Sequence, residues 1–193
     1  MAVDGLRDEP FTPEVRSSEH VYSGAVWNVL DDRVRYNDGE IRRQYVQHPG
    51  AAAVVALDDA GRVLLIQQYR HPIRHRDWEV PAGLLDVPGE PPLETARREL
   101  AEEADLQAER WEPLVSMFTT PGGNDEVVHL FLARGLRPVG HTFAREAEEA
   151  DMRLEWVPLT DVVDAVMAGR MRNGILATGV LAAAERLRRD PEA

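Results

Sequence analysis

The sequence predicts an α+β fold in which a mixed β-sheet lies between helices and a small antiparallel sheet precedes it. Apolar, strand-like runs flank one central helical segment, and a second helical region closes the chain. The run Asn37-Asp38-Gly39 separates two stretches of alternating polarity, and it predicts a hairpin because Asn and Gly accept positive φ. We therefore expect three parts: a loosely ordered tail at 1–18, an N-terminal β-sheet domain at 19–48, and a main domain at 49–190.

The N-terminal sheet is expected to begin at His20. The predicted strands cover 21–30, 31–36 and 40–47. A sheet of this size has little core of its own and must pack on something.

The main domain should contain the mixed sheet and two further helices. The expected strands are 51–57, 62–68, 111–118, 126–133 and 152–157, and the polar stretch 69–77 is expected to be a loop. Thr160 can cap a helix that ends at Gly169. Asn173 opens the last helix, whose expected inner face is Leu176, Val180, Leu181, Ala184 and Leu187.

Composition excludes some classes of partner. A net charge of −12 argues against nucleic acid or an anionic membrane as the main partner, although local arginines could still meet a small phosphorylated substrate. No run approaches the roughly 18 apolar residues of a membrane span, and the N-terminus lacks the apolar core of a secretory signal. The chain has no cysteine, which excludes disulfides and thiol catalysis, and a cytoplasmic setting is expected.

The most informative stretch is 83–106. Pro92 suits a first helical turn, and Leu93, Ala96, Leu100 and Ala104 follow at helical spacing. Glu99, Glu102 and Glu103 then crowd within one turn, where three carboxylates repel one another unless a cation lies between them. A hard divalent cation fits this description. The alternative is a solvated helix face on which Arg97 and Arg98 neutralise some of the glutamates.

This stretch resembles the Nudix box, G-x5-E-x7-R-E-U-x-E-E-x-G-U, in which U is aliphatic. Glu90, Arg98-Glu99-Leu100, Glu102-Glu103 and Leu106 match the pattern in register. Two positions depart from it: six residues instead of five separate Gly83 from Glu90, and Asp105 replaces the last glycine. Aspartate enters the left-handed conformation more readily than most residues, and neither departure removes an expected metal ligand.

Within this superfamily, residues 20–187 are most similar to the ADP-ribose pyrophosphatases. The pieces that carry the similarity are 42–50, 67–70, 79–83, 120–123 and 148–151. The resemblance implies an α/β/α sandwich and hydrolysis of the pyrophosphate bond of ADP-ribose to AMP and ribose 5-phosphate. Two alternatives stay open: another nucleotide sugar or a dinucleotide as substrate, or a Nudix-fold binding protein without catalysis.

The resemblance also implies roles for individual residues. Glu99, Glu102, Glu103 and the backbone carbonyl of Ala82 would hold Mg²⁺ or Mn²⁺, and Glu90 would pair with Arg98. The general base would be a glutamate of the loop 140–150. Glu146, Glu148 and Glu149 lie on that loop, spacing to the next strand favours Glu148, and Glu126 is the next candidate. The alternative for this loop is a solvated acidic segment.

Five residues are implied to bind the substrate: Trp27 by stacking, Arg43 and Arg70 through their planar guanidinium groups, and Pro121 and Gly122 as part of the pocket wall. A core tryptophan and surface ion pairs are the alternatives for the first three. The resemblance further implies a homodimer formed through the N-terminal sheet.

Overall fold

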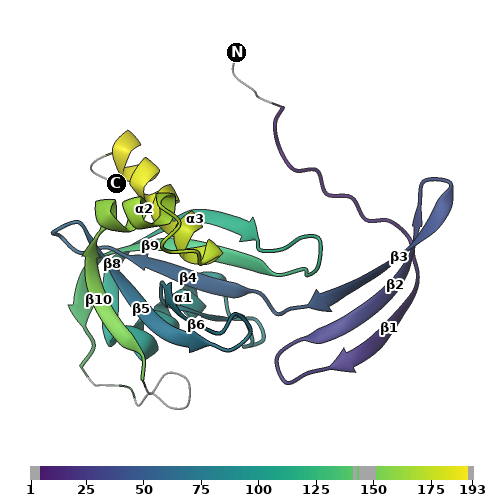
Figure 1. Ribbon diagram of the computed structural model, residues 1–193, viewed down its shortest axis with the longest axis horizontal. Coiled ribbons are helices and arrows are strands. Elements are labelled where there is room, and N and C mark those ends of the chain that lie inside the picture. The colour runs from purple at the N-terminus through teal and green to yellow at the C-terminus, as the bar shows by residue number, and fades with distance from the viewer. Residues whose placement is uncertain (1–4, 141–142, 144–150, 191–193) are drawn as a thin grey trace. The chain divides into compact units, whose positions relative to one another are not determined.

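The computed structural model describes residues 5–140, 143 and 151–190 (Figure 1). The chain forms two compact units. The first comprises residues up to His48 together with Gly122–Asp125, and the second comprises Pro49–Pro121 and Glu126 onward.

The first unit is an antiparallel sheet of three strands in the order β1-β2-β3 (Figure 1). The strands are β1 (Val15–Ser23), β2 (Asn28–Tyr36) and β3 (Gly39–Gln47). Tyr36 pairs with Gly39, and Asn37 between them has φ of 51°, so the predicted hairpin is present. The short segment Gly122–Asp125 joins this unit through β3, since the Val46 N–H donates to the Gly123 oxygen over 2.9 Å.

Two expectations for this unit were wrong in detail. Strand β1 begins at Val15, inside the stretch expected to be loosely ordered. The expected single strand 21–30 is broken by a turn, which the Gly24 N–H closes by donating to the Trp27 oxygen over 3.0 Å. A Cβ at position 24 would lie 2.6 Å from that oxygen, so glycine is required there. Trp27 consequently lies in a turn.

The second unit contains two sheets and three helices. Its strands are β4 (Ala51–Ala56), β5 (Arg62–Arg70), β6 (His75–Glu79), β7 (Ala82–Leu84), β8 (Leu106–Phe118), β9 (Val127–Pro138) and β10 (Arg153–Pro158). The order β7-β4-β9-β8 is mixed, because β4 and β9 run parallel while the other pairs are antiparallel. The second sheet, β10-β5-β6, is antiparallel. The helices are α1 (Pro92–Ala104), α2 (Leu159–Met167) and α3 (Gly174–Arg189).

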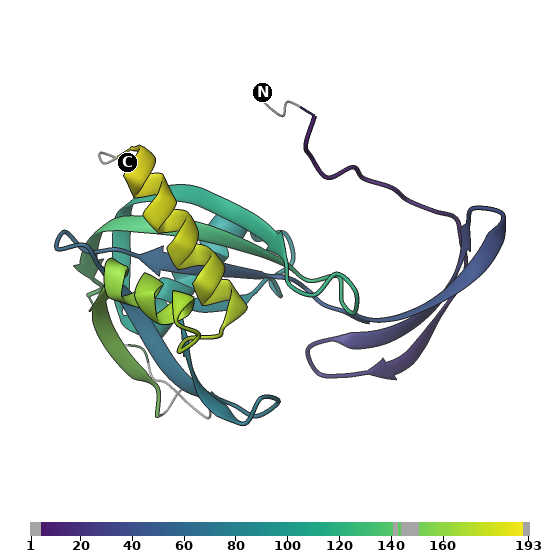
Figure 2. The same cartoon turned by 45° about the horizontal axis from the view of Figure 1, so that its top comes forward.

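The core lies on both faces of β4, all six residues of which are buried. Successive side chains of a strand point to opposite faces of the sheet. Val55 therefore packs in the cluster that contains Leu176 and Val180 of α3, whereas Val54 packs in the cluster that contains Leu100 of α1. Figure 2 shows α2 and α3 together on one face of the mixed sheet. A mixed sheet between helices, preceded by a small antiparallel sheet, confirms the predicted fold class.

Several local predictions need correction. Helix α2 begins one residue before Thr160, and its N-cap is Pro158, whose side chain cannot accept a hydrogen bond. Leu181 is 38% exposed and does not belong to the inner face of α3, whereas Asn173 caps that helix as expected by accepting the Leu176 N–H over 2.9 Å. The polar stretch 69–77 forms the tip and part of a β5–β6 hairpin, with Arg74 at φ of 53° in the turn.

Among the residues that the structure describes, no helix has both the length and the apolar character needed to cross a membrane.

Candidate functional site

Helix α1 presents its acidic side to a cavity because its apolar side is buried. Pro91 has extended backbone angles and Pro92 opens the helix, where a missing N–H costs nothing. Ala96 and Leu100 are fully buried against the sheet. The helix ends at Asp105, which adopts the left-handed conformation with φ of 54°. The predicted helix and the predicted tolerance of aspartate at the last box position are therefore both confirmed.

The cavity beside α1 has a volume of about 270 Å³. Its lining comes from three elements, which are β5 with Gln68 and Arg70, the strand β7, and α1 with Arg98, Glu99 and Glu103. Asp86, just after β7, also lines it. It therefore combines one run of backbone, two arginines and several carboxylates in the second unit.

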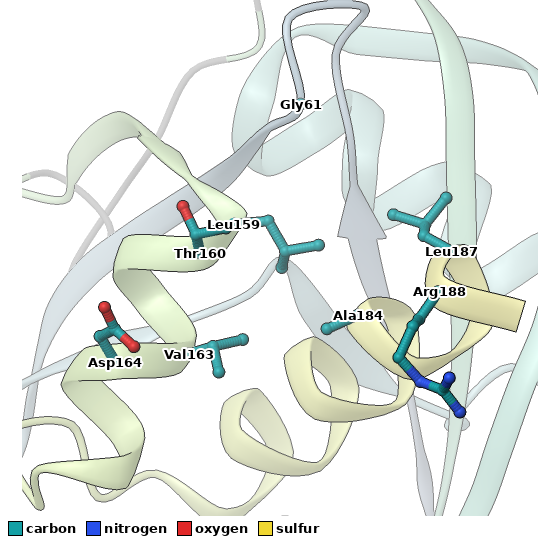
Figure 3. Close-up of a pocket in the computed structure, with 8 residues that line it drawn as sticks. All are labelled: Gly61, Leu159, Thr160, Val163, Asp164, Ala184, Leu187 and Arg188. Carbon is teal, nitrogen blue, oxygen red and sulfur yellow. The ribbon is translucent and has the colours of Figure 1, made fainter. Parts of the chain in front are cut away.

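A larger cavity of about 480 Å³ lies between α2 and α3, and Figure 3 shows its lining. Leu159, Val163, Ala184 and Leu187 line it, with Asp164 and Arg188 also present. Its apolar lining offers little chemistry for hydrolysis, so the smaller cavity beside α1 is the better candidate site.

Arg98 is the cation that separates the glutamates of α1 in this structure. Its Nη1 donates to Glu99 Oε1 over 2.5 Å and to Glu102 Oε2 over 3.3 Å, and its Nη2 donates to Glu90 Oε2 over 3.3 Å. Thr95 Oγ1 also donates to Glu90 Oε2, over 2.8 Å. The expected contact between Glu90 and Arg98 is thus present. Arg97 instead pairs with Glu94 over 2.7 Å.

This arrangement shifts two pKa values in opposite directions. The hydrogen bond from Thr95, followed by that from Arg98, holds the pKa of the Glu90 carboxyl below its usual value. Burial acts to lower the pKa of the Arg98 guanidinium, but the hydrogen bond to Glu90 and the charges of Glu99 and Glu102 outweigh it and raise that pKa. Arg98 and Glu90 therefore both stay charged across the physiological range.

The backbone of β7 contacts two of the glutamates closely. Glu103 is buried, and its Oε2 accepts the Ala82 N–H over 2.9 Å, which ties α1 to β7. The carboxyl of Glu99 lies directly over Gly83, since a Cβ there would be 1.9 Å from Glu99 Oε1. No side chain fits at residue 83 while the Glu99 carboxyl stays where it is.

The donors around this cavity suit a hard divalent cation. Glu99 and Glu103 offer carboxylate oxygens beside the backbone of Ala82 and Gly83, and Glu102 shares Arg98 with Glu99. Oxygen-only sets of this kind fit Mg²⁺ or Mn²⁺. Within the described ranges, no three acidic or histidine side chains are gathered closely enough to hold a metal ion as they stand, and Arg98 lies between two of the carboxylates.

Sequence reasoning missed the role of Glu79. This buried carboxylate accepts two hydrogen bonds from Arg70, from Nε over 2.6 Å and from Nη2 over 2.7 Å, and a longer one from Gln68. The pair fixes the plane of the Arg70 guanidinium beside the cavity. The available signal was that Glu79 begins the segment 79–83, one of the pieces that carry the family resemblance.

The other expected substrate residues lie elsewhere in the chain. Trp27 and Arg43 belong to the first unit, where Trp27 is 42% exposed and Arg43 Nη1 donates to the Arg42 oxygen over 2.9 Å. Trp27 is therefore not a core residue of that unit. Pro121 and Gly122 are exposed.

Among the candidates for the general base, Glu126 accepts a hydrogen bond of 2.6 Å from Thr119 Oγ1. The three loop glutamates, Glu146, Glu148 and Glu149, lie outside the described residues.

Comparison with known proteins identifies the family. The model of the NUDIX domain matches residues 47–176. The ADP-ribose pyrophosphatase of Mycobacterium tuberculosis is 48% identical over 170 residues, which cover 88% of this chain and 82% of that protein. The methanol dehydrogenase activator of Bacillus methanolicus is 39% identical over 127 residues, which cover 65% of this chain and 68% of that protein.

A solved structure shares the fold. The crystal structure of an ADP compounds hydrolase superposes with a TM-score of 0.78 at 20% identity, and the match covers 97% of this chain and all of that one. The family model spans more than half of the chain and includes the whole box. As the box predicted, the chain belongs to the NUDIX family and is a Nudix-type enzyme.

Proposed function

We propose that the protein hydrolyses the pyrophosphate bond of ADP-ribose, giving AMP and ribose 5-phosphate, with a divalent metal ion as cofactor. The observation that carries the proposal is the cavity in which the carboxylates of α1 lie beside Arg70. Anionic oxygens for a cation and a guanidinium for phosphate are the two things that a diphosphate substrate needs. The 48% identity to an ADP-ribose pyrophosphatase supports the choice of substrate.

Glu99, Glu102 and Glu103, with the carbonyl of Ala82, are the proposed ligands of Mg²⁺ or Mn²⁺. When bound, the cation neutralises diphosphate charge and lowers the pKa of a coordinated water. Glu103 is held in place by the Ala82 N–H, and the lack of a side chain at Gly83 leaves room for Glu99. NUDIX hydrolases generally use divalent metal ions, and the oxygen donors here agree with that use.

Arg70 is the proposed phosphate-binding residue of this unit. Its guanidinium is planar and always charged, and the bidentate contact with buried Glu79 restricts its rotation. A group fixed in this way loses little conformational entropy when the substrate binds.

The general base is proposed to be Glu148, with Glu146 and Glu149 as its neighbours on the same acidic segment. Hydrolysis needs a carboxylate near the attacking water, and Glu99 and Glu103 would be engaged as ligands. Glu126 is the next candidate, although it already accepts a hydrogen bond from Thr119.

The first unit is proposed to form a homodimer and to contribute to substrate binding through Trp27 and Arg43. Every residue of β1 is exposed in the single chain, and the first unit contributes few residues to the buried core. Pro121 and Gly122 are proposed to form part of the pocket wall. Light scattering of the purified protein should give twice the mass of the chain, and the mass of one chain would refute the dimer.

A substrate panel tests this proposal against its alternatives. The purified protein with Mg²⁺ should hydrolyse ADP-ribose with a kcat/KM at least tenfold above that for GDP-mannose and a dinucleotide such as diadenosine diphosphate. A preference for either of those compounds would move the assignment to another nucleotide sugar or a dinucleotide. No hydrolysis of any of the three would favour a binding or activating role, like that named for the relative from Bacillus methanolicus.

A further inference from the structure

Gln68 is a buried polar residue of the cavity beside α1 to which the proposed function gives no role. It lies on β5, two positions before Arg70, and only 4% of its surface is exposed. Buried polar groups are almost always hydrogen-bonded. The side-chain amide has one end that donates and one that accepts, so both ends need a partner.

The donating end of this amide has its partner. Nε2 of Gln68 donates to Glu79 Oε2 over 3.4 Å, and the same oxygen accepts Arg70 Nη2 over 2.7 Å. A carboxylate can only accept hydrogen bonds, so the nitrogen of the amide must be the end that faces Glu79. The ion pair between Glu79 and Arg70 therefore also sets which way the Gln68 amide is turned.

The accepting end is open to the cavity. Among the residues that the structure describes, none donates a hydrogen bond to Gln68 Oε1. The side-chain atoms of this part of the chain that lack a partner and are also sealed from solvent are Asp32 Oδ1 and Arg98 Nε. Gln68 Oε1 is therefore accessible, and the accessible side of Gln68 is the one that lines the cavity. An uncommitted acceptor thus faces the space beside Arg70.

The chemistry of this oxygen decides which part of a substrate it can bind. Phosphate oxygens at neutral pH accept hydrogen bonds, so an amide oxygen gains nothing from them, whereas a hydroxyl group can donate. Gln68 and Arg70 lie on the same face of β5, with their Cα atoms about 7 Å apart. A sugar bonded to a phosphate that Arg70 holds can bring a hydroxyl group to Gln68.

We propose that Gln68 is a specificity-determining residue whose Oε1 accepts a hydrogen bond from a hydroxyl group of the sugar next to the diphosphate. This inference rests on the proposed function and adds to it the recognition of the sugar. ADP-ribose has two such sugars, the ribose of the adenosine and the terminal ribose. Both offer the same chemistry, and the experiment below distinguishes them.

Two matched substitutions isolate the acceptor. Gln68→Met keeps the length of the side chain and removes the oxygen, while Glu79 retains its hydrogen bonds from Arg70. Gln67→Met is the control, because the side chain of Gln67 points to the opposite face of β5 and is not part of the cavity lining. Urea unfolding shows whether either substitution affects the fold, and both variants should unfold close to the wild-type midpoint.

Three compounds are compared by kcat/KM at saturating Mg²⁺. They are ADP-ribose, its analogue without the two hydroxyl groups of the adenosine ribose, and ADP methyl ester, which has no terminal ribose. For one of the two analogues, wild type should prefer ADP-ribose by at least tenfold, as expected for a buried acceptor left without a donor. In Gln68→Met that preference should be tenfold to a hundredfold smaller, and in Gln67→Met it should be unchanged. The analogue that shows the effect identifies the sugar.

Equal preferences in wild type and Gln68→Met for both analogues would overturn the proposal, because a residue that only supports Glu79 would lower activity on all three compounds alike. A higher Mg²⁺ requirement in Gln68→Met with unchanged preferences would overturn it too, since Gln68 would then be a metal ligand. Wild-type protein that hydrolyses all three compounds equally well would refute it even if Gln68→Met did not fold.

Failure of the proposed function is visible separately, as wild-type protein that leaves ADP-ribose intact. The same three compounds are then compared by calorimetric binding to wild type and to Gln68→Met. Equal affinity ratios in the two proteins would again contradict a role for Gln68 in recognising the sugar.

Discussion

Replacing Gly83 with alanine should damage the site while leaving the fold intact. A Cβ at position 83 would lie 1.9 Å from Oε1 and 2.0 Å from Cδ of Glu99, well inside the 3.0 Å that real contacts respect. The carboxyl of Glu99 must therefore move by about 1 Å, away from the position in which Arg98 holds it. This carboxyl is the far end of a flexible side chain, so it can move without displacing the backbone.

The cost to folding should be small. Pushing Glu99 off its rotamer lowers the free energy of unfolding by roughly 1 kcal/mol. Replacing glycine with alanine within a strand raises it by about 0.5–1 kcal/mol. The free energy of unfolding of Gly83→Ala should therefore lie within about 1 kcal/mol of wild type in urea titration. Its kcat/KM for ADP-ribose should fall about a hundredfold, as expected for a displacement of about 1 Å in a catalytic site.

Gly174→Ala is the matched control, because a Cβ at position 174 meets nothing within 4 Å and the backbone there needs no positive φ. That variant should keep full activity and gain slightly in stability, since alanine is the better helix former. Wild-type kcat/KM in Gly83→Ala would refute the argument, because Glu99 would then not need its present position. A loss of several kcal/mol in stability would refute it as well.

Three further predictions follow from single residues. Glu103→Gln should lower kcat by orders of magnitude while its circular dichroism spectrum stays native, because glutamine still accepts the Ala82 N–H but loses the charge proposed to bind the metal; normal turnover at saturating Mg²⁺ would exclude Glu103 as a ligand. Glu148→Gln should reduce kcat sharply with little change in KM, and a larger effect from Glu146→Gln would move the base to that residue. The hydrogen bond from Arg42 lowers the pKa of the Asp31 carboxyl from 3.8 to about 2, so its contribution to stability is complete above about pH 4 and disappears as the pH falls through 2. The difference in free energy of unfolding between wild type and Asp31→Asn, measured by urea titration, should vanish over that range. A difference that grows as the pH falls would contradict the lowered pKa of Asp31.

The parts of the fold that are decided locally could be predicted from the sequence. The box helix followed from Pro92 and the spacing of Ala96 and Leu100, all of which are placed as expected. The turn at Asn37 and the left-handed end at Asp105 depend on the preferences of single residues. Each of these signals lies within a few residues of the structure that it specifies.

The remaining features depend on contacts between distant segments. The segment Gly122–Asp125 joins β3 through backbone hydrogen bonds, which carry no side-chain signature. The stretch 69–77 was too polar to be read as a strand, because β5 and β6 form a hairpin whose end is exposed. Glu79 gave no sign that it would be buried, because its partner Arg70 lies nine positions earlier on a neighbouring strand.

The arrangement of the site shows the same division. Sequence spacing predicted that Glu99, Glu102 and Glu103 lie on one side of α1, but it could not show that Arg98 bonds two of them. The choice between a metal ion and the Arg98 guanidinium as their counter-charge depends on the rotamer of that one long side chain. Sequence periodicity does not specify rotamers.

The most direct test of the account is the product analysis of ADP-ribose incubated with the purified protein. With Mg²⁺ present, we expect AMP and ribose 5-phosphate in equal amounts, and addition of EDTA should abolish both products until Mg²⁺ is restored in excess. Intact ADP-ribose after incubation with Mg²⁺, or cleavage that continues in EDTA, would contradict the claim that α1 holds a metal ion for pyrophosphate hydrolysis.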